Sequence, residues 1–395
     1  MMIQAVLSNP SHPESGVATI PFPIPHDQYA HCMELLEALE IGDAVKADCK
    51  VEKIDSFYTV LKRTEMLTVN VEELNYLAKR LDSFDTGEAA QFQAMAHKLE
   101  LFELKDLINL TFCCQQATVI TDFSDLAAIG RDHYMNLHGG SAKTEELDAL
   151  DGEETARRLI ESGGGTITPY GVVYDNGMKL EQVYDGRFFP CYYYEPNAIT
   201  VAVTSKSELE DTEHITWLYL PMEREEVDRA LLRGGITDPA DVRLRLEDSQ
   251  LPNEVDVLLD MEYENLSDLN ELATATDGLS KADMEKLGAV VMLAKPKSAA
   301  QIKNLAESLD LFDLAPGAHT PQEYGKYMIQ QSGHFDYDEN LDAFYDYEKY
   351  GMERMNEEDG MFTDRGYIAY KGYISMEEVM NGSQSSHMEM GGLSR

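Results

Sequence analysis

An internal repeat with a fixed offset of 195 residues constrains the fold of this chain most strongly. Residues 70–79 read NVEELNYLAK and residues 265–274 read NLSDLNELAT. Each copy begins with an Asn that is followed three residues later by an acidic residue, which is the pattern of a helix N-cap with its partner. Apolar residues then recur at helical spacing in both copies. The repeated pattern therefore predicts two copies of one supersecondary unit.

Two further helices are predicted in each copy at the same offset. Asp85 corresponds to Ser280, and each of them is again followed three residues later by an acidic residue. Asn109 and Asn304 are identical and lie in a third segment with helical apolar spacing. The apolar faces of these helices predict a small helical core in each copy.

A helix introduced by proline and a β-prone run precede each set of three helices. Residues 22–39 and 220–232 carry the helical pattern, and residues 49–54 (CKVEKI) and 241–246 (DVRLRL) are β-prone. The sequence thus predicts an α+β fold, an elongated chain of small α/β subdomains. We expect two diverged tandem repeats, joined by a segment that contains a β-hairpin.

The segment between the repeats has its own predicted elements. Asp151 is the expected N-cap of a helix over residues 151–160, whose acidic and basic residues are spaced for ion pairs. Asn176-Gly177 lies between Val- and Tyr-rich runs, which is a hairpin pattern. The end of the chain lacks apolar periodicity, which predicts disorder. The expected domains are a first repeat at 1–138, a connecting segment with an acidic helix and a Tyr-rich hairpin at 139–213, a second repeat with an acidic C-terminal subdomain at 214–375, and a disordered tail at 376–395.

The negative charge of the chain predicts that it does not bind nucleic acid directly. The 395 residues include 72 acidic and 32 basic residues, a formal net charge of -40 at pH 7. Such an imbalance exceeds what solubility requires and opposes compactness. In B-form DNA the same charge is spread over roughly 70 Å of duplex, or about 20 base pairs. One chain could therefore imitate the charge of a DNA site; the alternative is an ordinary acidic cytosolic or halophilic protein.

No motif predicts catalysis or a cofactor. Asp336, Asp338 and Asn340 copy the opening of a calcium-binding EF-hand loop, but Leu341 stands where the turn needs Gly and Tyr347 where a Glu is required. The histidines are scattered, and the motifs of serine hydrolases, phosphate loops and zinc proteases do not occur. We expect a protein that is not an enzyme and needs no cofactor and no metal. A metal-dependent hydrolase built on the Asp336 cluster is the enzymatic alternative.

Cysteine usage and hydropathy predict a cytoplasmic protein. The five cysteines form no CxxC pair, and their odd number fits a reduced compartment. The beginning of the sequence has no basic region leading into an apolar core, and no stretch reaches 18 uncharged apolar residues. We therefore expect no membrane partner.

Two acidic runs are interleaved with apolar residues at helical spacing. Residues 247–285 hold twelve acidic residues and one basic residue, and residues 334–365 hold eleven and three. Folded helices would fix these carboxylates in rows, and a DNA-binding partner positions Lys and Arg for phosphates. The alternative is a solvated acidic face. The carboxylates that form the candidate partner-binding surface are Glu145, Glu146, Asp148, Glu153, Glu154, Glu247, Asp248, Glu254, Asp256, Asp260, Glu262, Glu264, Asp268, Asp336, Asp338, Glu339, Asp342, Asp346, Glu348, Glu357, Glu358 and Asp359.

The order of the motifs in the second repeat resembles the ArdA family of antirestriction proteins. The resemblance spans about residues 218–373, and a weaker copy covers about residues 21–138. Each motif alone is weak, and the ordered set carries the likeness. The motifs are LxxLNxLA at 266–273, LSKADMEKLGAVV at 279–291, SAAQIKNLAESLDLFDLAPG at 298–317, EYGKYMI at 323–329, FYDYEKYGMERM at 344–355 and FTDRGYIAY at 362–370.

The resemblance implies an elongated homodimer of small α/β subdomains whose carboxylates imitate bent B-form DNA. Such a protein occupies the DNA-binding cleft of type I restriction-modification enzymes and needs no cofactor. This chain departs from the family pattern because it holds two family-like units and a Tyr-rich insert. One molecule could thus supply what other members reach by pairing. The alternative functions are a DNA mimic directed at another defence system, and an acidic adaptor of a mobile-element complex that docks through the Tyr-rich hairpin.

Overall fold

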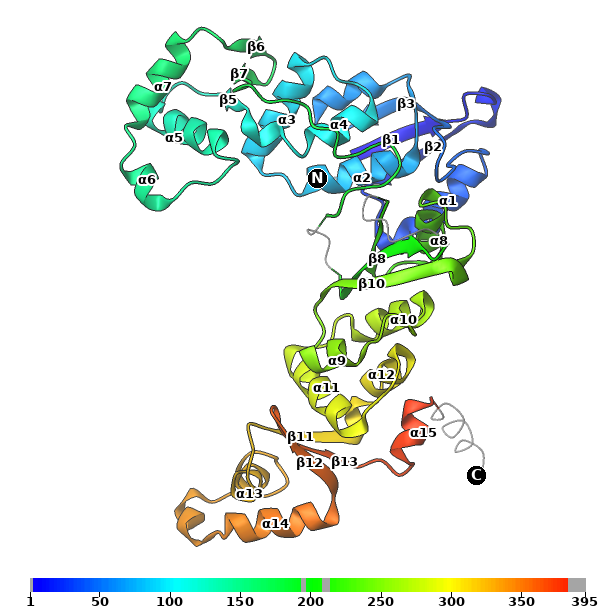
Figure 1. The fold of residues 1–395 in the computed structure, drawn as a ribbon, viewed down its shortest axis with the longest axis vertical. Coiled ribbons are helices and arrows are strands. Elements are labelled where there is room, and N and C mark those ends of the chain that lie inside the picture. Colours follow the sequence, from blue (N-terminus) through cyan, green and yellow to red (C-terminus); the bar gives the residue numbers. More distant parts are fainter. Residues whose placement is uncertain (1–2, 193–196, 208–213, 383–395) are drawn as a thin grey trace. The chain divides into compact units, whose positions relative to one another are not determined.

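The computed structural model describes residues 3–192, 197–207 and 214–382, and confirms the α+β class (Figure 1). In this part of the chain the strands form four small sheets of three or four strands each. Contacts divide the described residues into two compact units. The first unit comprises residues 3–192, 214–216 and 223–237, and the second comprises residues 197–207, 217–222 and 238–382.

The first unit begins with a four-stranded sheet in the order β2-β1-β3-β4. Its central strand β1 pairs antiparallel with β2 and with β3, which confirms the predicted β-prone run at Cys49. Ile3, Ala5 and Leu7 alternate toward the core. The strands and the helix of this part are β1 (Ile3–Ser8), β2 (Val17–Phe22), α1 (Tyr29–Glu37), β3 (Cys49–Asp55) and β4 (Thr68–Val69).

Three helices follow this sheet, and the first two have the predicted caps. The Asn70 side chain accepts a hydrogen bond from the Glu73 amide, and Asp85 forms a reciprocal capping box with Glu88. These bonds satisfy amide groups that a helix start leaves without partners. The helices are α2 (Val71–Asp82), α3 (Thr86–Lys98) and α4 (Leu104–Leu110).

A second sheet, in the order β5-β7-β6, continues the first unit past residue 138. Strand β7 pairs with β5 and with β6, so backbone pairing joins residues 118–120 to part of the predicted connecting segment. The expected boundary at 138 therefore falls inside a folded subdomain. Its elements are β5 (Thr118–Ile120), α5 (Leu126–Leu137), α6 (Thr144–Asp148), α7 (Gly152–Glu161), β6 (Thr166–Thr168) and β7 (Gly171–Tyr174).

The hairpin predicted at Asn176-Gly177 is wrong. The chain does turn there, since the Met178 amide bonds to the Asp175 carbonyl, but residues 175–192 contain no strand. The hairpin of this segment lies earlier in the sequence and is formed by β6 and β7, which pair antiparallel. Beyond the turn, Tyr184 is fully buried and exchanges two backbone hydrogen bonds with the Asn109 side chain. The tyrosine therefore packs into the first unit instead of pairing as a strand.

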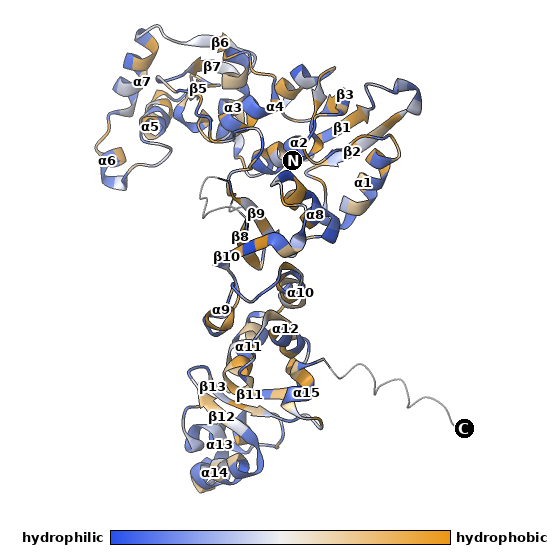
Figure 2. Cartoon of the chain, turned by 45° about the vertical axis from the view of Figure 1, so that its right-hand side comes forward, coloured by the Kyte–Doolittle hydropathy of each residue, from blue (hydrophilic) through white to orange (hydrophobic). Residues whose placement is uncertain are grey.

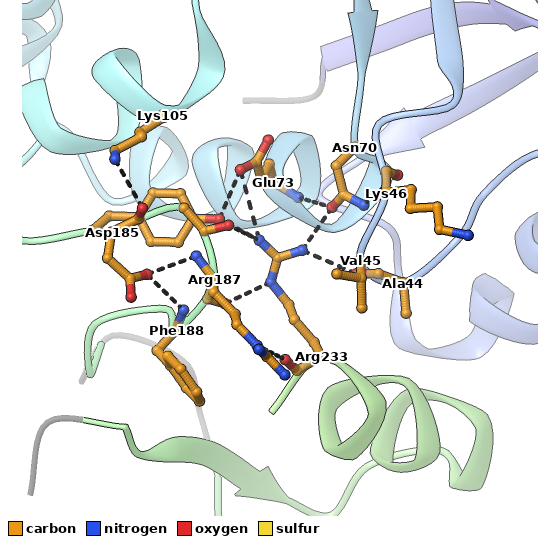
Figure 3. A network of polar contacts seen from close by, with 12 residues as sticks. Ala44, Val45, Lys46, Asn70, Glu73, Lys105, Asp185, Arg187, Phe188 and Arg233 are labelled. Atoms are coloured by element: carbon orange, nitrogen blue, oxygen red, sulfur yellow. Dashed lines mark hydrogen bonds and ion pairs between the residues drawn. The ribbon is translucent and has the colours of Figure 1, made fainter. Parts of the chain in front are cut away.

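Helix α8 (Arg224–Arg233) belongs by its contacts to the first unit, although it lies within the predicted second repeat. Arg229 bonds to Glu72 of α2 at 2.6 Å. Arg233 is 5% exposed and donates to the Ala44 carbonyl, to Asn70 and to Tyr184 (Figure 3). Helix α8 therefore packs with residues that precede the expected boundary at 214, because Arg229 and Arg233 bond to residues of the first unit.

The second unit repeats the order of elements. Its first sheet has the order β10-β8-β9, and β10 confirms the β-prone run that starts at Asp241. Asn265 and Ser280 accept hydrogen bonds from the amides three residues later, as predicted. The elements are β8 (Ile199–Ser205), β9 (Thr216–Leu220), β10 (Val242–Ser249), α9 (Asn253–Leu258), α10 (Leu266–Thr276), α11 (Lys281–Ala294) and α12 (Ala299–Ala306).

A second subdomain follows in this unit, with a sheet in the order β11-β13-β12. Its core includes Tyr324, Met328 and Tyr367. Helices of both units carry hydrophobic and hydrophilic residues side by side (Figure 2). The elements are β11 (Phe312–Pro316), α13 (Pro321–Gln330), the short 3-10 helix η7 (Glu339–Phe344), α14 (Tyr347–Glu357), β12 (Asp359–Thr363), β13 (Gly366–Tyr370) and α15 (Met376–Met380).

The predicted disorder of the tail is wrong for its first residues. Ser375 and Glu378 form a capping box at the start of α15, and Val379 is buried. The rest of the expected tail, residues 383–395, lies outside the described residues.

The offset of 195 residues extends to the last strands of both units. Asp151 and Asp346 are the N-caps of α7 and α14. The hairpins also match: the Thr168 hydroxyl bonds to the Gly171 carbonyl at 2.8 Å, and Thr363 bonds to Gly366 at 2.9 Å. Gly171 and Gly366 have φ of 127° and 131°, a region that favours glycine. The duplication thus reaches β7 in the first copy and β13 in the second.

Candidate partner-binding surface

Most of the candidate carboxylates are exposed on folded elements. Five of them lie in the first unit, on α6 and α7, and the others lie in the second unit. Exposed side chains are free to meet a partner without a change of fold. The exposed members are Glu145, Glu146, Asp148, Glu153, Glu154, Glu247, Asp248, Asp260, Glu262, Asp336, Asp338, Glu339, Asp346, Glu348, Glu357 and Asp359.

The remaining six are half-buried and have contacts inside the second unit. They are Glu254, Asp256, Glu264, Asp268, Asp342 and Glu358. Glu264 accepts the Ala299 amide with both oxygens at the start of α12, and Asp268 accepts the Asn265 side chain at 2.7 Å. Burial raises the pKa of Glu264 and of Asp256. These carboxylates support the fold, so they are the weakest members of the candidate surface.

Asp342 fastens η7 to the helix pair α13 and α14. Its carboxylate accepts hydrogen bonds from Gln330 of α13, from Tyr337 at 2.7 Å and from Tyr347 of α14. The hydrogen bonds from Tyr347 and Tyr337 hold the pKa of Asp342 below its usual value. This residue is part of the cluster that copies a calcium loop in sequence, and its side chain is used to position the short helix.

Glu358 closes the other end of α14. It accepts a hydrogen bond from the Tyr324 hydroxyl at 2.5 Å and forms an ion pair with Arg354. Burial, together with the hydrogen bond to Glu358, raises the pKa of Tyr324. The tyrosine therefore stays protonated and remains a donor to this carboxylate.

Glu254 and Arg365 form a two-bond ion pair that connects distant parts of the second unit. The guanidinium of Arg365, in the turn between β12 and β13, donates to both oxygens of Glu254 in α9 at 2.8 Å. It also pairs with Glu285 of α11. The hydrogen bond from Arg365 lowers the pKa of the Glu254 carboxyl. Such a fork geometry fixes orientation as well as charge.

The pair predicts a pH-dependent contribution to stability. Glu254→Gln is expected to lower the free energy of unfolding of the second unit by about 1 kcal/mol at pH 7. Because the folded pKa of Glu254 lies below its usual value of 4.5, this contribution is complete above pH 4.5. It is lost as the pH falls through the folded pKa, so wild type and variant should converge in acid. Urea unfolding at several pH values measures the difference.

Glu262→Gln is the matched control for this measurement, because Glu262 is an exposed residue of the same unit. Its effect should be small at every pH. A Glu254→Gln effect that stays constant down to pH 3 would contradict the assigned role of the ion pair.

The basic residues next to the candidate carboxylates are largely held in ion pairs. In α7, Arg157 pairs with Glu153 and Arg158 with Glu154, as the spacing predicted. Arg245 pairs with Glu247, and Lys349 pairs with Glu353 at 4.0 Å. These pairs partly neutralise Glu153, Glu154 and Glu247. The carboxylates of α6 and of residues 334–348 are not neutralised by these ion pairs.

Sequence reasoning missed the polar residues that hold these carboxylates. Nothing local identifies Arg365 as the partner of Glu254, because the two are 111 residues apart. A signal did exist for Asp342: Tyr337 and Tyr347 flank it at five residues on either side. Alternating Tyr and Asp in that stretch is the pattern that could have indicated hydroxyl-to-carboxylate bonds.

The described residues offer no arrangement suited to metal binding. No group of three or more His, Cys, Asp or Glu residues among them could hold an ion. In the same part of the chain, no helix has the length and apolar character needed to cross a membrane. The arrangement that the structure does provide is a set of exposed carboxylates on helices, on strands and in the turns between them.

The elements from β9 to β13 and their acidic residues correspond to part of a known protein family. Residues 212–369 match the model of the antirestriction protein (ArdA) family. The ArdA match confirms the resemblance found over residues 218–373, and it supports an antirestriction function and interaction with restriction enzymes in general. The matched range ends in β13 and does not include the first copy. Among curated proteins, no match to the chain was found.

Proposed function

We propose that this chain is a non-catalytic inhibitor of a type I restriction-modification enzyme and acts in the cytoplasm. Its carboxylates stand in for DNA phosphates and occupy the DNA-binding cleft of the enzyme. The ArdA match over residues 212–369 supports the antirestriction role. The net charge of -40 supports a partner surface rich in Lys and Arg.

The observation that carries this proposal is the exposure of carboxylates on elements that the fold holds in place. Asp338 and Asp346 cap η7 and α14, and Asp151 caps α7, so the neighbouring acidic residues project from fixed backbone. A rigid array loses little conformational freedom when it binds. A flexible acidic tail of the same charge would lose more, because each residue must be ordered on binding.

Both halves of the chain contribute to the charge. Residues 1–195 contain 32 acidic and 15 basic residues, and residues 196–395 contain 40 and 17. A partner could therefore meet an acidic module in either half. The ArdA pattern predicts a homodimer, and a duplicated chain could instead act as a monomer; light scattering of the inhibitory species measures which form binds.

The proposed function is tested by inhibition of purified type I restriction enzymes. DNA cleavage by a susceptible enzyme should fall as the chain is added, and the inhibition should weaken steeply between 50 and 200 mM salt, conditions chosen because charge contacts are lost over about this range. Inhibition that does not depend on salt would contradict the phosphate-mimicking role. No inhibition across several type I enzymes would contradict the proposed target.

The adaptor alternative receives less support. It relied on the Tyr-rich segment as a docking site, but Tyr184 and Tyr192 are buried in the first unit. Tyr193 and Tyr194 lie outside the described residues. A pull-down that recovers DNA-transfer or replication proteins, without a restriction enzyme, would favour the adaptor.

A further inference from the structure

The short helix η7 is a fixed platform on the surface of the second unit. Asp342 binds it to Gln330 of α13 and to Tyr347 of α14, and the Asp338 side chain caps its start. In a 3-10 helix, side chains three residues apart lie on the same face. The Asp342 contacts therefore turn one face of η7 toward α13 and α14, and Glu339 at the first position of η7 remains exposed. The other faces of η7 are turned away from that contact.

Leu341 and Phe344 share another face of η7, and both are exposed. Leu341 is 47% exposed and Phe344 is 83% exposed. Single exposed apolar residues are common on protein surfaces, but here two large ones stand together on one turn of a helix that is fastened from behind. The pair is therefore held in a fixed position on η7 and remains open to solvent.

The chain on either side of the pair is acidic. Residues 334–348 contain six acidic residues and no Lys or Arg. Asp336, Asp338 and Asp346 are exposed around η7. An apolar centre with a charged rim is the usual arrangement of a protein–protein contact, in which the central large side chains contribute most of the affinity. The rim selects a partner surface of positive charge.

We propose that Leu341 and Phe344 anchor the second unit in an apolar pocket whose rim carries Lys and Arg, on the nucleic-acid-binding surface of the restriction enzyme. This inference rests on the proposed function and adds a contact that does not depend on charge. The carboxylates bring the basic surface to η7, and the Phe344 ring fills the pocket and lies against its Arg side chains, which favour aromatic faces. The first unit has Glu146 and Ala149 at the corresponding positions, so the anchor belongs to the second unit alone.

The anchor is tested with full-length Leu341→Ser and Phe344→Ser variants, titrated against a type I enzyme that the wild type inhibits. Phe344→Ser is expected to weaken binding about tenfold at every salt concentration, which corresponds to about 1.4 kcal/mol. The slope of affinity against salt should stay that of the wild type, because no charge is removed. Phe344→Leu, which keeps an apolar side chain, should retain most of the affinity.

Val257→Ser and Ile167→Ser are the matched controls, since Val257 is 85% exposed in the second unit and Ile167 is 84% exposed in the first. Each should change the affinity less than twofold, and circular dichroism should show that all variants are folded. Wild-type affinity in Phe344→Ser would overturn the anchor while leaving the proposed function intact. A wild-type chain that binds no type I enzyme would overturn both.

Discussion

Arg233→Met is expected to lower the free energy of unfolding of the first unit by about 3–5 kcal/mol. The guanidinium of Arg233 donates to the Ala44 carbonyl and the Asn70 side chain at 3.0 Å each, and its Nε donates to the Arg187 carbonyl at 2.8 Å (Figure 3). It also lies 3.7 Å from Glu73. Methionine fills the space but removes all of these donors at a buried position. The Ala44 carbonyl loses its bond to Arg233, and Asn70 keeps the Glu73 amide as a donor, so the unmet hydrogen bonds cost more than the lost bonds alone. Urea unfolding measures the loss.

Arg224→Met is the matched control in the same helix. The Arg224 side chain is 96% exposed and pairs with Asp228 at 3.9 Å, so its replacement should change the free energy of unfolding by less than about 0.5 kcal/mol. If the two variants had equal effects, α8 would not be held in the first unit by Arg233.

Removing four exposed carboxylates of the second unit should weaken the interaction with the restriction enzyme about a hundredfold. The variant carries Asp336→Asn, Glu339→Gln, Glu348→Gln and Asp359→Asn, which avoids the carboxylates that cap helices or bind tyrosines. Each exposed charge contributes a fraction of a kcal/mol, and four together give about 3 kcal/mol. The salt dependence should also become shallower, because fewer charge contacts remain. Inhibition titrations at several salt concentrations measure both effects.

A control variant changes the net charge by the same amount at other exposed residues of the second unit, Asp277, Glu307, Asp310 and Glu377. It should lose less than about fivefold in affinity, since these positions keep only a long-range effect. Equal losses in the two variants would show that total charge matters and that the placement of carboxylates does not.

Local features of the sequence predicted the helices well. The caps at Asn70, Asp85, Asn265 and Ser280 depend on residues three positions away, so the signal is complete within one turn. The full extent of the repeat was harder to find, because the matching hairpins share little beyond Thr168 with Gly171 and Thr363 with Gly366. Asn176-Gly177 misled the prediction, since a turn signal does not reveal whether a partner strand follows.

The sequence predicted the exposed carboxylates of the candidate surface, but it did not predict which carboxylates bond to other side chains of the fold. Alternating acidic and apolar residues indicate which carboxylates face solvent. The bonds that hold Glu254 to Arg365 and Glu358 to Tyr324 join residues far apart in sequence, so only the fold brings them together. The attachment of α8 to the first unit likewise depends on contacts with residues about 160 positions earlier. Arg229 bonds to Glu72, and Arg233 bonds to Asn70.

Competition with DNA for a purified type I restriction enzyme shows whether the carboxylates of the chain stand in for DNA phosphates. The enzyme is first bound to a fluorescent duplex that contains its recognition site, and the chain is then added at increasing concentration and at several salt concentrations. The chain should displace the duplex completely, with an apparent affinity that falls steeply with salt. A stable complex containing enzyme, duplex and chain together would contradict that role.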